Sequence, residues 1–392
     1  MSVLTGPVPA TAGAPPDPVD VPGAARTPRH IAIVDGGSFV LPYVHELAMA
    51  LHRRGHRVTV FASHTRYNPE FLDALRTVPG IEVVAAAVSG SVAPRWRGAP
   101  AYLGLLWTLW RRRSQFDTVD FQFPVLWPLE LLLWRALGRR VVMTVHNAVP
   151  HGHAGQRHRP TEWTARMARA LVFASDATRA DFLRRYGDAW AGRSTVVPHG
   201  LLPLAPGEPP RPPRVPTTVR TLVYWSTVKP YKGVELMGAL ARSPAVQQRG
   251  LALEVHGRWS PDLVALRTEL LGLGVRVDDR YLGAEALRAL FSRDDVVFLL
   301  PYRAASQSGA LYTLLHQGAC ILCTDTGDLG DVMRRHGLDD LLLDAASPAA
   351  VLAALDRLQA RPEAWRHAFA AAQRASGWDE ALAGGAAVYD AG

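Results

Sequence analysis

The stretch 298–318 reads FLLPYRAASQSGALYTLLHQG and places an apolar strand, a polar loop and an apolar helix in direct succession. The apolar run that starts at Val296 ends at Pro301 and is too short for a helix, which indicates a buried strand. Ser308 is a typical helix N-cap, and Gly309 lets a ligand approach the backbone closely. Because a helix start has unpaired N–H groups, the stretch predicts an anion site, although a capped helix after an ordinary loop has the same pattern.

A second strand–loop–helix turn lies at residues 226–236, STVKPYKGVEL. It holds Lys229 and Lys232, the only lysines in a chain with 43 Lys+Arg. A lysine ammonium is a compact point charge on a flexible stem, and phosphate sites often use one. The pattern therefore indicates a phosphate-binding turn, with a chance placement of the two lysines as the alternative.

Together these two stretches resemble the donor-binding half of GT-B glycosyltransferases of family 4. The runs WSTVKPYKGV (225–234) and DDVVFLLPYRAASQSGAL (294–311) are similar to two motifs of one branch of that family, in the same order and separation. VVPHG (196–200) and TVHN (144–147) resemble two further, weaker motifs. The resemblance covers most of the chain after residue 29. It implies an α/β fold of the GT-B type, in which two Rossmann-like domains face each other across a cleft.

The resemblance also implies a hexosyltransferase that uses a nucleotide-diphosphate sugar as co-substrate. Its leaving group develops negative charge, which Lys229 and Lys232 would stabilise as cations. The backbone N–H groups of Ser308, Gly309 and Ala310 would add fixed dipoles. Enzymes of this fold work without the Asp-x-Asp metal motif, and this chain has no such triplet. The expectation is therefore a reaction with no metal and no other cofactor.

One departure from the family concerns the two glutamates, E-x7-E, that many members carry across this helix. The span 302–317 has no acidic residue. Gln307 or Thr313 would have to replace those donor contacts. The departure leaves open whether transfer proceeds with retention, which the family implies, and whether the chain is a non-catalytic protein that binds a sugar nucleotide.

Several polar residues follow expected strands of the N-terminal half. Gly36 and Gly37 form a Gly-rich turn, and His146, Ser175 and His199 also lie at strand ends. Ligands of open α/β sheets bind beyond the carboxyl ends of the strands, so one common crevice is expected. The resemblance makes His146 a catalytic candidate near the transferred sugar. It places Gly36, Gly37 and His199 at the cleft or acceptor, although a histidine at a strand end is often only structural.

The domain prediction follows from composition. Residues 1–28 are rich in Pro, Ala and Gly and are expected to form a disordered tail, not a signal peptide. Residues 29–200 form the acceptor-binding domain, and the Pro-rich stretch 201–218 is the linker. Residues 219–376 form the donor-binding domain, and residues 377–392 cross back to the first domain, as the resemblance implies. The expected strands include Val141–Val145, Thr221–Trp225, Leu251–His256, Val275–Tyr281, Val296–Leu300 and Ala319–Thr324.

The net charge of +8 is uneven. Residues 1–200 contain 23 Lys+Arg and 14 Asp+Glu, whereas residues 201–392 contain 20 and 21. The basic half is expected to face an anionic membrane surface or a phosphorylated acceptor, and nucleic acid is disfavoured because no nucleic-acid module is recognisable. Residues 101–110, AYLGLLWTLW, run into three arginines and fit either a buried helix, which is favoured, or a membrane-interface helix. The stretch 126–137 belongs to the same surface or to the core.

Cysteine and histidine usage gives no metal site. Cys320 and Cys323 lie on an apolar strand and are expected in the core. His151, His153 and His158 lie in a run without a nearby carboxylate or cysteine, which favours a loop at the cleft mouth. Few cysteines and no spanning apolar run predict a cytoplasmic protein, with peripheral contact at the inner membrane face left open.

Three functions are compatible with these patterns. The leading one is hexose transfer from a nucleotide sugar to a lipid-linked or polysaccharide acceptor. Transfer to a soluble small molecule is the second, and the non-catalytic binding protein is the third.

Overall fold

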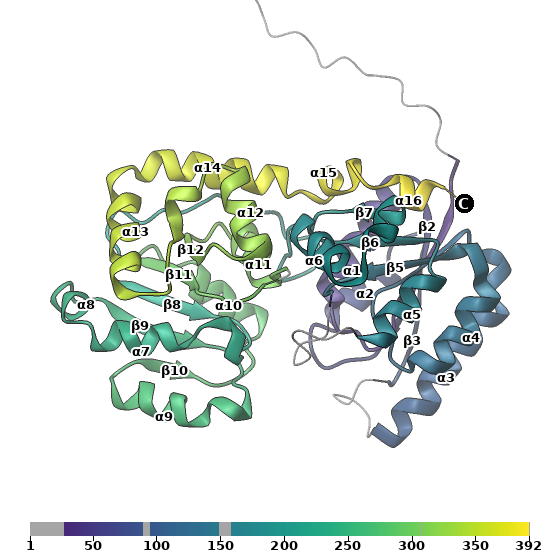
Figure 1. Ribbon diagram of the computed structural model, residues 1–392, viewed down its shortest axis with the longest axis horizontal. Coiled ribbons are helices and arrows are strands. Elements are labelled where there is room, and N and C mark those ends of the chain that lie inside the picture. The colour runs from purple at the N-terminus through teal and green to yellow at the C-terminus, as the bar shows by residue number, and fades with distance from the viewer. Residues whose placement is uncertain (1–26, 89–94, 149–157, 306, 392) are drawn as a thin grey trace, which may run out of the picture.

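The computed structural model describes residues 27–88, 95–148, 158–305 and 307–391. The tail predicted to be disordered falls on residues 1–26, outside this range, apart from its last two residues. In the described residues the chain forms two lobes, each built on a parallel β-sheet with helices on its faces (Figure 1). This is the two-domain α/β architecture that the sequence predicted.

The N-terminal lobe is built on a seven-stranded sheet of order β3-β2-β1-β4-β5-β6-β7, in which every pair is parallel. Its strands are β1 (His30–Asp35), β2 (Arg57–Ser63), β3 (Ile81–Ala86), β4 (Thr118–Phe121), β5 (Val141–Val145), β6 (Ala170–Phe173) and β7 (Ser194–Val196). Its helices are α1 (Leu41–Arg53), α2 (Glu70–Arg76), α3 (Arg95–Arg111), α4 (Trp127–Leu137), α5 (Arg159–Met167) and α6 (Asp176–Tyr186). The strand order reverses direction beside β1, so the ends of β1 and β4 flank the switch point where α/β folds bind ligands.

The C-terminal lobe has a six-stranded parallel sheet of order β10-β9-β8-β11-β12-β13. Its strands are β8 (Thr221–Trp225), β9 (Ala252–His256), β10 (Arg276–Asp278), β11 (Val296–Leu300), β12 (Ile321–Thr324) and β13 (Leu342–Leu343). Its helices are α7 (Glu235–Arg242), α8 (Pro244–Gln248), α9 (Val264–Gly272), α10 (Ala284–Phe291), α11 (Gly309–His316), α12 (Gly327–Arg335), α13 (Pro348–Ala360) and α14 (Pro362–Ala375). Here the switch point lies between β8 and β11, directly beneath the two motifs.

The chain ends on the N-terminal lobe. After α14, which lies along the top of the C-terminal lobe in the view of Figure 1, it continues into α15 (Trp378–Ala383) and α16 (Ala387–Asp390), which lead over the N-terminal lobe. Trp378, Leu382 and Tyr389 belong to the apolar core that also contains α1, α2 and β1. The last two helices are therefore built into the first lobe, although they follow the second in sequence.

The sequence located the central strands closely because those strands are short, predominantly apolar runs. β5, β8 and β11 have the predicted bounds, whereas β10 is shorter than the predicted 275–281. The helix at residues 101–110 differs from the favoured interpretation, which buried it. Along α3, Leu105 and Leu109 are buried, but Trp107 is 57% exposed. The stretch 126–137 contributes to both the core and the surface, because α4 buries Trp134 and exposes Leu132.

Candidate active site

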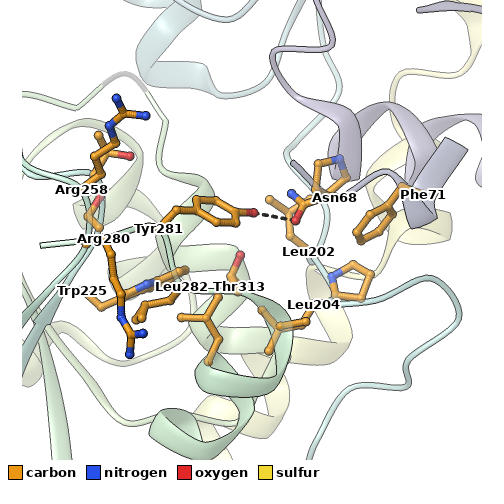
Figure 2. Close-up of a pocket in the computed structure, with 17 residues that line it drawn as sticks. Asn68, Phe71, Leu202, Leu204, Trp225, Arg258, Arg280, Tyr281, Leu282 and Thr313 are labelled. Atoms are coloured by element: carbon orange, nitrogen blue, oxygen red, sulfur yellow. Dashed lines mark hydrogen bonds between the residues drawn. The ribbon is translucent and has the colours of Figure 1, made fainter. Parts of the chain in front are cut away.

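A cavity of about 190 Å³ lies between the two lobes (Figure 2). It is lined by Pro42, Asn68 and Phe71 of the N-terminal lobe and by Leu202, Pro203 and Leu204 after β7. In the C-terminal lobe it is lined by residues of β8, α10 and α11 and of the loops that follow β8, β9 and β10. The phenol of Tyr281 donates a 2.6 Å hydrogen bond to Oδ1 of Asn68 across it. Ring contact of Tyr67 with Tyr281 reinforces this bridge. The cavity is thus closed on one side by a direct contact between lobes.

The lysine turn lies against the end of β11. Gly233 has φ +68°, and a Cβ there would lie 1.9 Å from the carbonyl oxygen of Pro301, so only glycine permits this approach. The Lys232 ammonium bonds the Ser226 hydroxyl and lies 5.0 Å from the centre of the Tyr302 ring. The two sequence motifs therefore meet at Tyr302.

Lys229 and Lys232 are two neighbouring cations without counter-ions in the described part of the chain, since neither forms an ion pair there. Partial burial, together with the charge of Lys232, lowers the pKa of Lys229. Two like charges held close together gain energy when an anion binds between them. Ser226 and Thr227, which precede the lysines, line the cavity, so this turn borders it directly.

The start of α11 has the form expected of an anion site. Ser308 is the N-cap, and its hydroxyl accepts from the backbone N–H of Leu311. A Cβ on Gly309 would meet only Leu202, at 3.4 Å, so the glycine is not required by packing alone. Ala310 follows on the first turn, and Thr313, one turn further on, lines the cavity. Of these residues only Thr313 lines the cavity, whereas Ser308, Gly309 and Ala310 do not.

Gln307 joins the two lobes. Its amide nitrogen donates a 2.8 Å hydrogen bond to Nδ1 of His146. Its amide oxygen, Oε1, is buried and has no hydrogen-bond partner among the described residues. A buried acceptor without a partner is costly, and a hydroxyl of a bound ligand would satisfy it. The sequence named both residues, and the structure brings them into contact.

His146 is neutral and tightly held. Its ring stacks on Phe123 with centroids 4.6 Å apart, and its Nε2 lies 2.9 Å from Oε1 of Gln122. Burial, and then the nearby His199, lower the pKa of His146 to about 3. At neutral pH the side chain therefore acts as a hydrogen-bonding group rather than as a cation.

Beneath His146 lies a buried polar cluster that the sequence analysis missed. Gln122 donates to Asp120, and the Asp120 carboxylate also accepts from Thr144 at 2.8 Å and from the Tyr389 hydroxyl at 2.8 Å. Burial raises the pKa of Asp120 to about 6. A signal was present, because Asp120 and Gln122 interrupt an apolar strand at a spacing of two, which places both side chains on one face.

His199 contacts the other lobe. Its ring stacks on Tyr312 of α11 with centroids 4.3 Å apart, and its Nδ1–H donates to the carbonyl of Gly200 at 2.7 Å. Burial lowers the pKa of His199 to about 4. The ring also lies edge-on to Tyr43, which contacts His146 in the same way. His199 therefore connects the two lobes next to His146. Ser175, the other residue predicted at a strand end, is the N-cap of α6.

In the turn after β1, packing against neighbouring rings explains why both positions are glycine. A Cβ on Gly36 would lie 2.1 Å from the Tyr102 ring, and one on Gly37 would lie 2.3 Å from the Phe39 ring. Asp35 caps the same turn through the N–H groups of Phe39 and Val40. Gly36 and Gly37 line neither the cavity between the lobes nor the one beside His146.

A second cavity, of about 340 Å³, lies beyond the ends of β4 and β5. Its walls are mostly apolar, with Phe123, Met143 and Val145 beside His146 and Thr161. His146 thus borders this cavity with its ring while Nδ1 faces Gln307. The arrangement gives one neutral imidazole between a region bounded by both lobes and a pocket in the first lobe.

The residues considered for metal or redox chemistry do not form such a site. Within the described ranges, no group of three or more His, Cys, Asp or Glu is placed to hold a metal. His151 and His153 lie outside those ranges. Cys320 and Cys323 are buried, and burial raises the pKa of both thiols. They are core residues, as expected.

Comparison with known proteins agrees with this architecture. Residues 42–201 match the family described as Glycosyltransferase Family 4. A search of curated proteins finds no match. Among solved structures, sucrose-phosphate synthase from Thermosynechococcus elongatus is 16% identical with a TM-score of 0.64, over 90% of this chain and 96% of that one.

Two further solved structures share the fold. Anabaena HepE in complex with UDP and glucose is 16% identical, with a TM-score of 0.61 over 89% of this chain and 94% of that one. WaaG, a glycosyltransferase involved in lipopolysaccharide biosynthesis, is 15% identical, with a TM-score of 0.55 over 88% of this chain and 95% of that one. At such identities the likeness shows the fold, which is the two-lobed GT-B architecture.

Proposed function

We propose that this GT-B glycosyltransferase moves a hexose from a nucleotide-diphosphate sugar to a lipid-linked or polysaccharide acceptor. The observation that carries the proposal is the contact of Lys232 with Tyr302, in the loop between β11 and α11, next to the cavity between the lobes that Ser226, Thr227 and Thr313 line. HepE, which shares the fold, binds UDP and glucose, and this supports a nucleotide sugar as donor.

In this proposal the C-terminal lobe holds the donor. Lys229 and Lys232 bind the pyrophosphate, and the N–H groups of Ser308, Gly309 and Ala310 bind it from the helix start. These groups are fixed before the reaction, so they stabilise the charge that develops on the leaving pyrophosphate without reorganising. We expect the reaction to need no metal, because two cations and a helix dipole already meet that charge. The Thr313 hydroxyl and the free Oε1 of Gln307 replace contacts that family members make with glutamates.

The N-terminal lobe positions the sugar and the acceptor. His146 is the catalytic candidate, because its Nδ1 faces Gln307 at the junction of the lobes. A neutral imidazole accepts a hydrogen bond at its unprotonated nitrogen, so a sugar or acceptor hydroxyl that displaces Gln307 could donate to Nδ1. His199, Gly36 and Gly37 support this region by packing. Retention of anomeric configuration is the expectation that comes with the family.

A lipid-linked acceptor fits an exposed apolar surface of the first lobe. We define the α3–α4 surface by Leu103, Trp107, Trp110, Leu129 and Leu132, which are each at least 36% exposed. Helices α3 and α4 are in contact and lie side by side (Figure 1), so these exposed apolar residues lie on two neighbouring helices of the first lobe.

The charges around this surface favour an anionic membrane. Between residues 95 and 140 there are eight arginines and three acidic residues, and two of the three, Asp120 and Glu130, are buried. Arg113 lies 4.6 Å from the centre of the Trp110 ring. Exposed tryptophans beside arginines suit the interface of an anionic bilayer. No helix in the described ranges is long and apolar enough to span a membrane, so we propose peripheral contact at the inner face.

Donor use is tested by incubating the protein with a panel of nucleotide-diphosphate sugars and measuring nucleoside diphosphate release and calorimetric binding. We expect one donor to bind and turn over, and release to be faster with acceptor-bearing membrane lipids. Absence of binding to every member of the panel would overturn the proposal.

Membrane contact is tested separately by co-sedimentation with phosphatidylcholine vesicles, with and without phosphatidylglycerol. We expect binding only to the anionic vesicles, and its loss in Trp107→Ser/Leu132→Ser. Leu271→Ser is the matched control, because Leu271 is equally exposed but lies on α9 of the other lobe. Equal loss in the control, or no binding at low salt, would contradict a membrane role for the α3–α4 surface.

A further inference from the structure

The orientation of the Gln122 amide is determined by its neighbours. Its nitrogen lies 2.9 Å from Oδ2 of Asp120 and 3.3 Å from the Thr144 hydroxyl. An ionised carboxylate only accepts hydrogen bonds, and Thr144 has already given its proton to Oδ1 of Asp120. Both neighbours therefore require a donor, and the amide must direct its NH₂ group to them. Its oxygen is left facing His146.

That orientation sets the tautomer of His146. Nε2 lies 2.9 Å from the Gln122 oxygen, which cannot donate, so Nε2 must carry the proton. The ring is neutral, so Nδ1 carries the lone pair, and this is the atom that accepts from Gln307. Each hydrogen bond in the series from Asp120 to Gln307 is then made with the correct donor and acceptor.

The series begins on the last helix of the chain. The Tyr389 hydroxyl of α16 donates to Oδ2 of Asp120, and both groups are buried. A buried carboxylate keeps its charge more readily when it accepts several hydrogen bonds, and Asp120 accepts from three side chains. The return of the chain to the first lobe thus places a donor directly beneath the catalytic candidate.

We propose that Asp120 and Gln122 are positioning residues that hold His146 as the Nε2–H tautomer, with Tyr389 of the C-terminal helix keeping Asp120 oriented and ionised. The inference rests on the proposed function for its effect on catalysis. It assigns His146 the role of hydrogen-bond acceptor at Nδ1, available to a hydroxyl of sugar or acceptor when Gln307 yields its place. The opposite tautomer would present an N–H at this position and repel a hydroxyl proton.

Asp120→Asn tests this directly because it is isosteric. The new amide can donate to the Gln122 oxygen, and Gln122 then turns its NH₂ group to Nε2 of His146. We expect the ring to shift its proton to Nδ1. In histidine-labelled protein at pH 8, two-bond ¹H–¹⁵N spectra report the tautomer, with the His146 signals assigned from His146→Gln.

The kinetic expectation is a loss of about 10²- to 10⁴-fold in kcat with little change in the KM for donor, as expected for a histidine held in the wrong tautomer. Tyr389→Phe removes one of three hydrogen bonds to Asp120 and should keep the tautomer, with a loss in kcat of less than about tenfold. A general packing defect would not change the tautomer selectively.

Asp328→Asn is the matched control, since Asp328 is a buried carboxylate in the other lobe that also accepts from a tyrosine, Tyr312. It should leave the His146 signals unchanged. The proposal is overturned if Asp120→Asn keeps the Nε2–H form, or if it reverses the tautomer and leaves kcat within twofold. The spectra test the positioning network even if the proposed transferase activity fails its own assay, so the two failures are distinguishable.

Discussion

The two lobes have related topologies but present different chemistry to the region between them. In the N-terminal lobe, His146, Gln122 and Asp120 form a hydrogen-bonded series whose donors and acceptors match. In the C-terminal lobe, Lys229 and Lys232 stand close together without counter-ions in the described ranges. The first arrangement has its hydrogen bonds satisfied without a ligand, whereas the second holds two like charges that a bound anion would stabilise.

This difference indicates how the work is divided. A group that needs an exact orientation is best held by a finished network on rigid strands, which leaves it no freedom to turn. A group that binds charge benefits from remaining unpaired until its partner arrives, because desolvation of an existing pair would oppose binding. Variants in the two lobes should therefore affect different kinetic parameters.

Among the variants that distinguish the roles of the two lobes, we expect the largest loss of kcat/KM for the double variant Lys229→Ala/Lys232→Ala. Each lysine is proposed to contribute a charge-assisted hydrogen bond of about 1.5–3 kcal/mol, so kcat/KM should fall by about 10²- to 10⁴-fold. Calorimetry should show weakened binding of nucleoside diphosphate as well. The double variant Lys229→Arg/Lys232→Arg is the control, because it keeps both positive charges. Unchanged donor affinity in the alanine variant would remove the phosphate assignment.

A second comparison uses the stability of the buried carboxyl in the C-terminal lobe. Burial raises the pKa of Asp328 to about 7, and folding therefore takes up a proton between the usual Asp pKa and pH 7. The stabilisation from this group is present at acidic pH and is lost as pH rises through 7. Asp328→Asn is neutral at every pH and keeps an acceptor for Tyr312.

We therefore expect the melting temperature of Asp328→Asn, relative to the unmodified chain, to rise by roughly 2–6 °C between pH 4.5 and pH 8. Thermal unfolding scans at the two pH values measure the difference. Asp35 and Asp120 have pKa values raised to about 6 in the other lobe and are unaffected by this substitution. A difference that stays constant with pH would show that Asp328 titrates normally.

The third variant addresses the donor contact that we propose for Thr313. Thr313→Val keeps the shape of a residue that lines the cavity and removes its hydroxyl. The loss of one hydrogen bond of about 0.5–1.5 kcal/mol predicts a weakening of nucleoside-diphosphate binding of about 2- to 10-fold. Titration calorimetry provides the measurement, with Thr268→Val, on exposed α9, as the control. Equal affinities for the three proteins would place the ligand away from Thr313.

The smallest effect is expected at the contact between the lobes. Tyr281→Phe removes the hydrogen bond to Asn68 and keeps the ring beside Tyr67. Tyr281 is 48% exposed, so water replaces the lost partner and the donor KM should change by no more than about threefold. Steady-state kinetics would measure it. A much larger change would mean that this bond, rather than the two lobes' separate sites, controls donor binding.

Much of the fold was predictable because it depends on local patterns. Short, predominantly apolar runs predicted β5, β8 and β11, and the Pro-rich stretch 201–218 separates the two sheets. The exposure of Trp107 was not predictable, since a helix that is apolar on all sides gives no sign of which face meets the sheet. That information comes only from the packing of α3 against its neighbours.

For the candidate site, the sequence named several of the residues that the structure places near the junction of the lobes, but neither the buried cluster beneath His146 nor the contacts between residues. The motifs named Lys232, Gln307 and His146, while the contact between Gln307 and His146 joins residues 161 positions apart. Nothing in the sequence indicated that the Tyr389 hydroxyl bonds Asp120, because a tyrosine in a terminal helix is usually a packing residue. Such contacts depend on how α16 folds over the first lobe, which no local pattern records.

The chain passes between the lobes twice, and the two passages are bonded to each other. Leu201 donates its N–H to the carbonyl of Ser376, and the Trp378 indole donates to the carbonyl of Leu201. Gly200 has no room for a side chain there, since a Cβ would lie 2.4 Å from the Trp378 ring. Two chain segments that are hydrogen-bonded to each other at one point allow the lobes to rotate about that point but resist translation of one lobe along the other. If the lobes move apart, we expect them to rotate about Leu201, which would separate Gln307 from His146 and allow the same contact to form again on closing.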